Sequence, residues 1–329
     1  MGLLPTHADR RVFISWWKYT SRPDSFARAM GAENYFMGQG ENWGLLKYLP
    51  RAWHCALTLL RRRPRLVFIS NPPTCAPCLV WLYCRLFNAK YCMDSHTSAF
   101  DRPRWLFFMP VHAFMARRAI WAATTNQELT NRVDAMGAAG VVVPDIPFDW
   151  PNTSYPVDKN KFSIAFICSF DIDEPILEAF EAARRMPDVQ FYVTGNAKKA
   201  APEIHANRPE NVTFTGFLSN DDYAGLVRSV SAVLVLTTLD FTMQRGGSEA
   251  ISAGKPLITT NFQMLKDVFY KGTVHVNNSP ESIIDAVRTI QRDRARFERE
   301  MDEMRAERQA RWETIKADLE QRIAAAFAR

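Results

Sequence analysis

The residues best suited to chemistry follow a short apolar run in the last third of the chain. Val233–Leu236 predicts a strand that is buried on both faces, and a polar loop with Gly246 and Gly247 separates it from a short predicted helix, Ser248–Ala253. The first N–H groups of such a helix and the positive end of its dipole attract anions, including diphosphates. Glu249 falls in the predicted first turn, where its carboxylate can cap helix-terminal amides or accept hydrogen bonds from a ribose diol.

A second polar group follows the predicted strand Lys90–Met93. Asp94 and His96 come directly after it, and the carboxyl ends of parallel strands are where α/β proteins place their clefts. A carboxylate and an imidazole at that edge can take the proton from a reacting hydroxyl. We therefore predict Asp94 and His96 as catalytic residues. The alternative is that Asp94 caps the next turn and His96 makes a structural hydrogen bond.

Two further loops contain residues that can bind a sugar or a phosphate. Trp17, Lys18 and Tyr19 follow the first predicted strand, and Asn71 follows the strand Arg65–Ser70. Aromatic rings stack on sugar faces, and a lysine binds phosphate. Trp17 fits a position in the hydrophobic core equally well.

The elements that position these residues alternate along the chain, which predicts two parallel sheets of the α/β class. The chain is long enough for two domains of about 150 residues each. We expect a first domain over residues 1–150, a second over 151–290 and a helical tail over 291–329, with a linker rich in Pro, Asp and Asn at 145–160. The expected strands are 11–17, 34–37, 65–70, 90–93, 119–123, 140–143, 162–168, 189–194, 211–218, 233–236 and 257–260.

The positive charge is concentrated in the first half of the chain. Residues 1–160 contain 19 Lys and Arg against 11 Asp and Glu, whereas residues 161–329 contain 22 against 24. Basic residues lie beside large apolar ones, as in Trp53–Arg63 and Trp105–Arg118, a pattern typical of helices at an anionic membrane surface. Core helices with solvated basic ends explain it equally well. Because no nucleic-acid-binding motif is present, we expect no nucleic acid partner.

The sequence lacks the motifs of dinucleotide-binding, secreted and membrane-spanning proteins. There is no G-x-G-x-x-G motif, no signal peptide and no transmembrane segment, so we expect a protein in the cytoplasm or attached to the inner face of the plasma membrane. Cys75 and Cys78 have the spacing of a redox or zinc pair, but no second close pair accompanies them. We interpret the cysteines as buried thiols and predict no metal site.

The segment Glu249–Ile258, EAISAGKPLI, resembles the E-A-x-x-x-G-K-P-V-I signature of nucleotide-sugar-dependent glycosyltransferases of the GT-B fold. This group includes bacterial lipopolysaccharide and capsule glycosyltransferases. Three shorter segments are also similar to GT-B enzymes, namely Asn71–Pro73 (NPP), Asp94–His96 (D-x-H) and Val141–Asp145 (VVVPD).

The resemblance implies two Rossmann-like domains facing a central cleft, with the C-terminal helices crossing back to the first domain; a coiled-coil dimer is the other reading of the tail. The first domain would bind a lipid-linked or cell-surface glycan acceptor through Trp17, Lys18, Tyr19 and Asn71. The second would bind a nucleotide diphosphate sugar, with no metal or other cofactor. The resemblance assigns the donor to Ser169, Phe170, Gly195, Asn196, Phe217, Leu218, Thr242, Gln244, Arg245, Gly246, Gly247 and Glu249.

One position departs from the pattern of the family. The retaining branch usually has a second glutamate eight residues before Glu249, where this chain has Phe241. The departure leaves retention or inversion of the sugar configuration open. It also leaves open a transferase-like binding subunit with little or no activity, and a sugar-nucleotide epimerase of the same fold is a further alternative.

Overall fold

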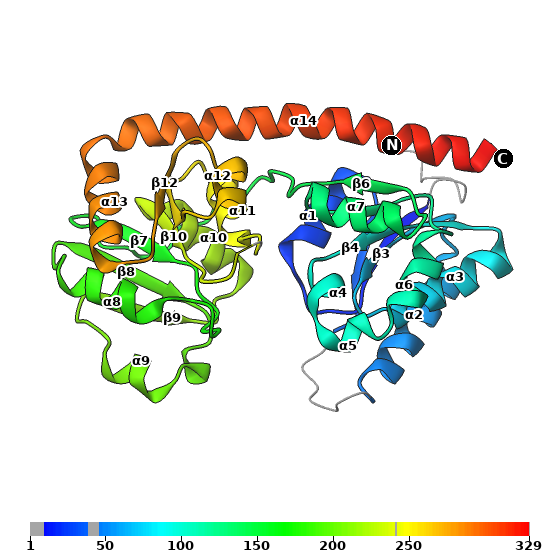
Figure 1. Ribbon diagram of the computed structural model, residues 1–329, viewed down its shortest axis with the longest axis horizontal. Helices are drawn as coiled ribbons and strands as arrows, with labels where there is room; N and C mark the ends of the chain where they lie inside the picture. Colours follow the sequence, from blue (N-terminus) through cyan, green and yellow to red (C-terminus); the bar gives the residue numbers. More distant parts are fainter. Residues whose placement is uncertain (1–9, 39–45, 241, 329) are drawn as a thin grey trace. The chain divides into compact units, whose positions relative to one another are not determined.

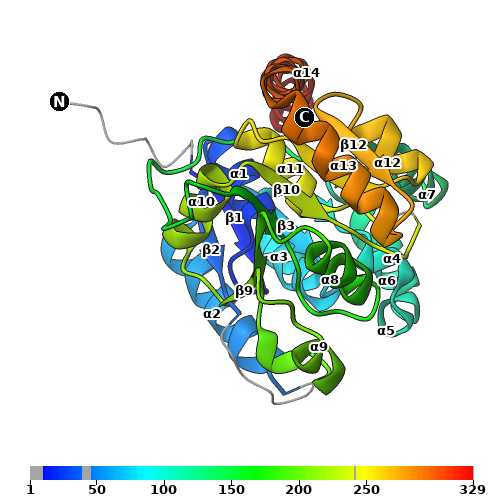
Figure 2. The same ribbon diagram turned by 90° about the vertical axis from the view of Figure 1, so that its left-hand side faces the viewer.

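The computed structural model describes residues 10–38, 46–240 and 242–328. The chain divides into two compact units: unit 1 comprises residues 1–146 and 311–329, and unit 2 comprises residues 147–310. Each unit has a six-stranded sheet covered by helices (Figure 1 and Figure 2). Among the described residues, no helix combines the length and the apolar character needed to span a membrane.

The sheet of unit 1 is parallel, and its strands lie in the order β2-β1-β3-β4-β5-β6. The strands are β1 (Arg11–Ser15), β2 (Glu33–Phe36), β3 (Leu66–Asn71), β4 (Lys90–Ser95), β5 (Ala122–Thr124) and β6 (Gly140–Val142). The helices are α1 (Ser21–Ala29), α2 (Tyr48–Arg62), α3 (Cys75–Phe87), α4 (Ser98–Asp101), α5 (Pro103–Leu106), α6 (Met109–Ala116) and α7 (Gln127–Ala135). Every residue of β3 is buried, as expected of a strand with helices on both faces.

Two hydrophobic clusters fill the two sides of this sheet. On one side, α2, α3 and α6 pack against side chains such as Ile14 and Ile69. On the other side, α1 and the end of α14 (Arg294–Ala328) pack against Phe13 and Phe68. Trp312 of α14 contacts Phe26 of α1, with the ring centroids 6.0 Å apart. The end of α14 is therefore part of the core of unit 1.

Unit 2 repeats this architecture with the strand order β12-β11-β10-β7-β8-β9, again parallel throughout. The strands are β7 (Phe162–Phe166), β8 (Val189–Thr194), β9 (Val212–Gly216), β10 (Ala232–Val235), β11 (Leu257–Thr260) and β12 (Thr273–Val276). The helices are α8 (Ile176–Arg184), η2 (Ala197–Lys199), α9 (Pro202–Ala206), α10 (Asn220–Ser229), α11 (Arg245–Ser252), α12 (Gln263–Val268), α13 (Pro280–Arg292) and the first part of α14. Helices α8 and α13 cover one face of the sheet, and α10, α11, α12 and α14 cover the other.

The predicted fold class is confirmed, and every predicted strand is present with ends shifted by a few residues. Strand β12 and helix α12 were not predicted. Helix α2 begins at Tyr48, and Phe241 lies outside the described residues.

In both sheets, the chain adds its first strands on one side of the starting strand and later strands on the other. This reversal determines where the loops come together. In unit 1 the chain goes from β1 to β2 on one side and later adds β3 on the other; in unit 2, β8 and β10 flank β7 in the same way. The loops that follow these strands meet at the carboxyl edge of each sheet, the usual location of a ligand in α/β proteins. Two glycines allow neighbouring loops to approach each other closely. A Cβ atom at Gly38 would overlap the backbone of Lys18, and a Cβ atom at Gly195 would overlap the carbonyl of Cys168.

The packing of α14 on unit 1 leads to a first prediction. Replacing Trp312, which is 3% exposed, by alanine should destabilise unit 1 by about 3–5 kcal/mol, because it leaves a cavity next to Phe26. Arg311→Ala, at the exposed preceding position, should change the stability by no more than about 0.5 kcal/mol. Urea unfolding followed by circular dichroism measures both; equal midpoints for the two variants would show that α14 does not belong to this core.

Candidate active site

In unit 1, three loops at the carboxyl edge are joined by hydrogen bonds. The indole N–H of Trp17, after β1, donates to the carbonyl of Pro72, after β3, at 2.6 Å. The backbone N–H of His96, after β4, donates to the carbonyl of Asn71 at 2.8 Å. The fold therefore brings together Trp17, Asn71, Asp94 and His96, which lie far apart in the sequence.

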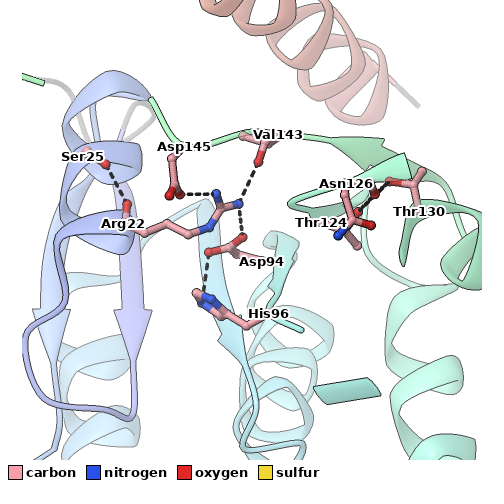
Figure 3. A network of polar contacts seen from close by, with 9 residues as sticks. All are labelled: Arg22, Ser25, Asp94, His96, Thr124, Asn126, Thr130, Val143 and Asp145. Carbon is pink, nitrogen blue, oxygen red and sulfur yellow. Dashed lines mark hydrogen bonds and ion pairs between the residues drawn. The ribbon is translucent and has the colours of Figure 1, made fainter. Parts of the chain in front are cut away.

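Asp94 lies in a network that the sequence analysis missed (Figure 3). Arg22, at the start of α1, donates from Nη2 to Asp94 Oδ1 at 3.0 Å and from Nη1 to Asp145 Oδ1 at 2.9 Å. The same Nη2 also donates to the carbonyl of Val143 at 3.0 Å. On its other side, Asp94 Oδ2 lies 3.4 Å from His96 Nε2. Asp94 thus connects one buried arginine with one histidine.

Burial and charge give Asp94 and His96 different roles. Asp94 is 2% exposed, and burial alone would raise its pKa, but the positive charge of Arg22 holds this pKa below the ordinary value of 3.8. Burial would likewise lower the pKa of Arg22, but Asp94 and Asp145 raise it. Asp94 is therefore a permanent carboxylate that orients His96, and His96 is the better candidate for accepting a proton.

The other predicted acceptor-site residues differ in exposure. Lys18 and Tyr19 are exposed, and the Tyr19 hydroxyl donates to Asp24 at 3.2 Å. Asn71 is completely buried, and neither side-chain amide atom has a hydrogen-bond partner among the described residues. Trp17 is half-buried and is held through its indole N–H by the loop after β3.

In unit 2, Glu249 is a buried carboxylate with fixed partners. It is 6% exposed, its Oε2 accepts a hydrogen bond from the Tyr223 hydroxyl, and its Oε1 lies 3.4 Å from Arg245 Nε. Burial and the Glu249 charge raise the pKa of Tyr223 well above its ordinary value, so that hydroxyl keeps its proton and donates. The indole N–H of Trp150 donates to the Glu249 carbonyl at 3.3 Å. Tyr223 and Trp150 are site residues that the sequence analysis missed.

The predicted start of the helix carrying Glu249 is wrong. Helix α11 begins at Arg245, with Gln244 as its N-cap, so Gly246 and Gly247 are helical and Glu249 lies in the second turn. Both glycines face the core, where a Cβ atom at Gly246 would press on Val235 and Ile167 and one at Gly247 would overlap the Phe269 ring. They allow the helix start to lie directly on β10 and α12.

The loop after β7, predicted to bind the donor phosphates, already binds a carboxylate. Glu174 accepts hydrogen bonds from the backbone N–H of Ser169 at 2.9 Å and of Asp171 at 3.0 Å, and also from the Ser169 hydroxyl at 3.0 Å. Phe170 has a φ of 61° and packs its ring on Phe214. An added phosphate can use these N–H groups only if Glu174 moves away.

Hydrogen bonds join this loop to the loop after β10. Asp173 Oδ2 accepts from the Thr237 hydroxyl at 2.8 Å, and the Asp173 carbonyl accepts from the Thr238 backbone N–H at 2.7 Å. Asn278 donates to the Thr237 carbonyl at 2.9 Å. The two loops beside the direction change of the sheet therefore form one connected rim.

The remaining residues predicted to bind the donor lie in the loops after β8 and β9 and in the segment just before α11. Gly195 has a φ of 93° and packs on the loop after β7, and Asn196 caps the short helix η2. Phe217 is 90% exposed after β9, and Leu218 packs at the edge of the core. Thr242 and Gln244 are partly exposed just before α11.

The cysteine thiols are all free. Cys75 is exposed and Cys78 is half-buried, so the interpretation as buried thiols is wrong for these two and holds for the other four. Partial desolvation of its thiol still raises the pKa of Cys75 to about 11, so this thiol is not an activated nucleophile. Within the described parts of the chain, no three His, Cys, Asp or Glu side chains gather as a metal-binding group.

Comparison with known proteins supports the fold of the chain. Residues 164–293, which include the rim and α11, match the family model described as glycosyl transferases, group 1. The chain has the GT-B fold. Sucrose-phosphate synthase from Thermosynechococcus elongatus has a TM-score of 0.69 and 13% identity, with 97% of this chain and 99% of that chain covered.

Two further structures have the same fold. Anabaena HepE, solved in complex with UDP-glucose, has a TM-score of 0.69 and 15% identity over 96% of this chain and 99% of its own. A putative UDP-N-acetylglucosamine 2-epimerase from Listeria monocytogenes has a TM-score of 0.60 and 11% identity over 90% of this chain and 91% of its own. A search of curated protein sequences returned no match.

The Arg22 network predicts a specific pH dependence of stability. Arg22→Met should destabilise the protein by about 3–5 kcal/mol at neutral pH, because it leaves Asp94 and Asp145 buried without their cation. In the natural protein the folded-state pKa of Asp94 is lowered, so its stabilising contribution is present above pH 3.8 and is lost only as the pH falls further. In the variant, burial raises this pKa, and stability should fall as the pH rises from 4 to 7.

Urea unfolding of both proteins at several pH values between 4 and 7 measures this effect. The difference in unfolding free energy should grow with pH. A difference that is constant across this range would contradict the role of Arg22 in keeping Asp94 ionised.

Proposed function

We propose that this protein is a glycosyltransferase that takes a hexose from a nucleotide diphosphate sugar. The observation that carries the proposal is Glu249, a buried carboxylate held by Tyr223 and Arg245 beside the rim of unit 2, within the segment matched by the glycosyl transferase family model. Burying a carboxylate is unfavourable unless it is paired, and its orientation toward fixed donors suits it to bind a ribose diol. HepE, a neighbour in fold, was solved with UDP-glucose, which supports a donor of this class.

In the proposed reaction, the sugar passes from the diphosphate to an acceptor hydroxyl. Backbone N–H groups at the start of α11, together with Arg245, would stabilise the negative charge on the leaving diphosphate. His96 Nε2 lies 3.4 Å from Asp94 Oδ2, and a proton kept on Nε2 beside this carboxylate would leave Nδ1 as the nitrogen that accepts the acceptor's proton. The proposal includes no metal and no other cofactor.

We place the acceptor in unit 1, held by Trp17, Lys18 and Tyr19, and propose a lipid-linked or cell-surface glycan precursor. Asn71, which is completely buried, can contact this acceptor only if the loop after β3 moves. An interfacial acceptor would suit a protein that sits in the cytoplasm and attaches to the inner membrane face through unit 1. Support comes from large exposed apolar side chains, including Trp53 on α2 and Phe107 in the turn between α5 and α6, which are 66% and 82% exposed. Basic residues lie near them in the sequence, and aromatic anchors beside cations favour an anionic bilayer surface.

The second candidate function is a sugar-nucleotide epimerase, favoured by the epimerase among the neighbours in fold. An epimerase would convert the nucleotide sugar without any acceptor. A transferase-like binding subunit would bind the nucleotide sugar and turn over neither substrate. Product analysis with and without acceptor separates the three.

The donor site is tested by Glu249→Gln. Glutamine keeps the size of the side chain and still accepts from Tyr223, but it removes the charge that a ribose diol would bind. We expect the affinity for the preferred nucleotide diphosphate to fall about tenfold to a hundredfold. Calorimetric titration with UDP, GDP and ADP measures the affinity.

The matched control is Glu203→Gln, which removes an exposed carboxylate from α9 of the same unit and should leave the affinity unchanged. An equal effect of both substitutions, or no nucleotide binding by the natural protein, would overturn the proposed donor site.

The proton acceptor is tested by His96→Ala. Turnover should fall by about 10²–10⁴-fold, because a general base has been removed, while the affinity for the nucleotide stays the same. The control is His54→Ala, an exposed histidine on α2. Full activity of the His96 variant in a nucleotide-release assay would exclude His96 as the base.

A further inference from the structure

Two segments of unit 1 contain basic residues and no acidic residue. Residues 42–93 contain eight Lys and Arg, and residues 102–127 contain four, and neither segment has a single Asp or Glu. These segments include α2, α3 and α6, which share one face of the sheet (Figure 1). Large apolar side chains are exposed on them, namely Leu49, Trp53, Leu60, Leu82, Leu86, Phe87, Phe107, Phe108, Val111 and Phe114.

A cavity of about 520 Å³ opens within this region. Its lining comes from α3, the turn after it, the start of β4 and the segment that follows α6, and it comprises Trp81, Cys84, Arg85, Asn88, Ala89, Lys90, Tyr91 and Arg118. Lys90 and Tyr91 begin β4, whereas Asp94 lies near its carboxyl end. Four residues of strand span about 13 Å, so this cavity is separate from the candidate active site.

The walls of the cavity are fixed by contacts among themselves. The Tyr91 hydroxyl donates to the Met115 carbonyl at 2.6 Å, which ties β4 to α6. Trp81 packs edge-on against Phe114 with centroids 5.6 Å apart, which ties α3 to α6. Arg118 lies over the Phe114 ring and donates to the Phe114 carbonyl at 3.1 Å. The cavity therefore has a defined shape before any ligand enters.

Its three cations lack anionic partners. Among the described residues, Arg85, Lys90 and Arg118 form no ion pair with a carboxylate, whereas arginines such as Arg185, Arg288 and Arg305 do. Three positive charges around one concave space favour a phosphate group, which arginine binds through paired N–H donors.

We propose that this cavity binds the phosphate headgroup of an anionic lipid. The apolar surroundings of the cavity favour a lipid over a free phosphate, because Leu82 and Leu86 flank Arg85 on α3 and Phe114 lies beneath Arg118. A headgroup phosphate held by the three cations would leave the acyl chains against these exposed side chains. The inference rests on the membrane association proposed above and gives it a specific binding site.

The test uses a short-chain lipid at concentrations below its critical micelle concentration, where it is dissolved as single molecules. No bilayer is then present, so the surface charge of a bilayer cannot contribute to binding. We would titrate the full-length protein with dihexanoyl phosphatidic acid by calorimetry, and separately with inorganic phosphate. The site variant is Arg85→Ala with Lys90→Ala; Arg118 is kept because it packs on Phe114. The matched control is Arg61→Ala with Arg102→Ala, which removes the same charge from exposed positions in the same acid-free segments outside the cavity.

We expect the natural protein and the control to bind the short-chain lipid alike, and the site variant to bind it at least about tenfold more weakly. Inorganic phosphate should bind much more weakly than the lipid. Equal loss in both double variants, or no binding of the lipid, would overturn the site, and inorganic phosphate binding as tightly as the lipid would overturn the lipid assignment. Nucleotide binding by unit 2, measured on the same variants, should be unchanged, which separates this result from the donor-site test.

Discussion

Both candidate sites depend on a buried carboxylate that is held by a fixed partner at the carboxyl edge of a parallel sheet. An ionised carboxylate is costly to bury unless a cation or a hydrogen-bond donor satisfies it. In unit 1, Arg22 supplies a full positive charge to Asp94, which keeps Asp94 ionised and leaves it to orient His96. In unit 2, the Tyr223 hydroxyl and Arg245 hold Glu249. The two carboxylates therefore differ in their surroundings: Asp94 lies beside a histidine, and Glu249 is the group that we propose binds the donor ribose.

Glu174 is a third carboxylate at these edges, and its contacts are of a different kind. It binds backbone N–H groups of the loop after β7, which in the resemblance approach the donor phosphates. An internal carboxylate here satisfies amides that would otherwise be exposed, and it keeps the loop in one shape. The rim is connected through Asp173 and Thr237, but a donor phosphate can reach the amides of this loop only if Glu174 moves away.

The sequence was sufficient for the fold because its signals are local. The apolar runs at β3, β7 and β10 are each bounded by polar or glycine-containing loops, and alternation with helices predicts a parallel sheet. Helix α11 was placed three residues late because Gly246 and Gly247 disfavour a helix by themselves, whereas their packing on Val235 and Phe269 stabilises it. Packing of this kind cannot be seen in a local sequence pattern.

The candidate sites were only partly predictable for the same reason. Asp94, His96 and Glu249 could be found because each directly follows or belongs to a recognisable element. Arg22 lies 72 residues before Asp94, and Tyr223 lies 26 residues before Glu249, and nothing in the sequence around them indicates these pairings. The acid-free segments were visible in the sequence, but the cavity at Arg85 and Lys90 results from how α3, β4 and α6 pack.

The most direct test of the central claim, that unit 2 holds a nucleotide diphosphate through Glu249, is a crystal structure with the nucleotide diphosphate that binds most tightly. We predict ribose hydroxyls within hydrogen-bond distance of the Glu249 carboxylate and phosphate oxygens at the N–H groups that begin α11. A nucleotide bound elsewhere, with Glu249 contacting only Tyr223 and Arg245, would contradict the account.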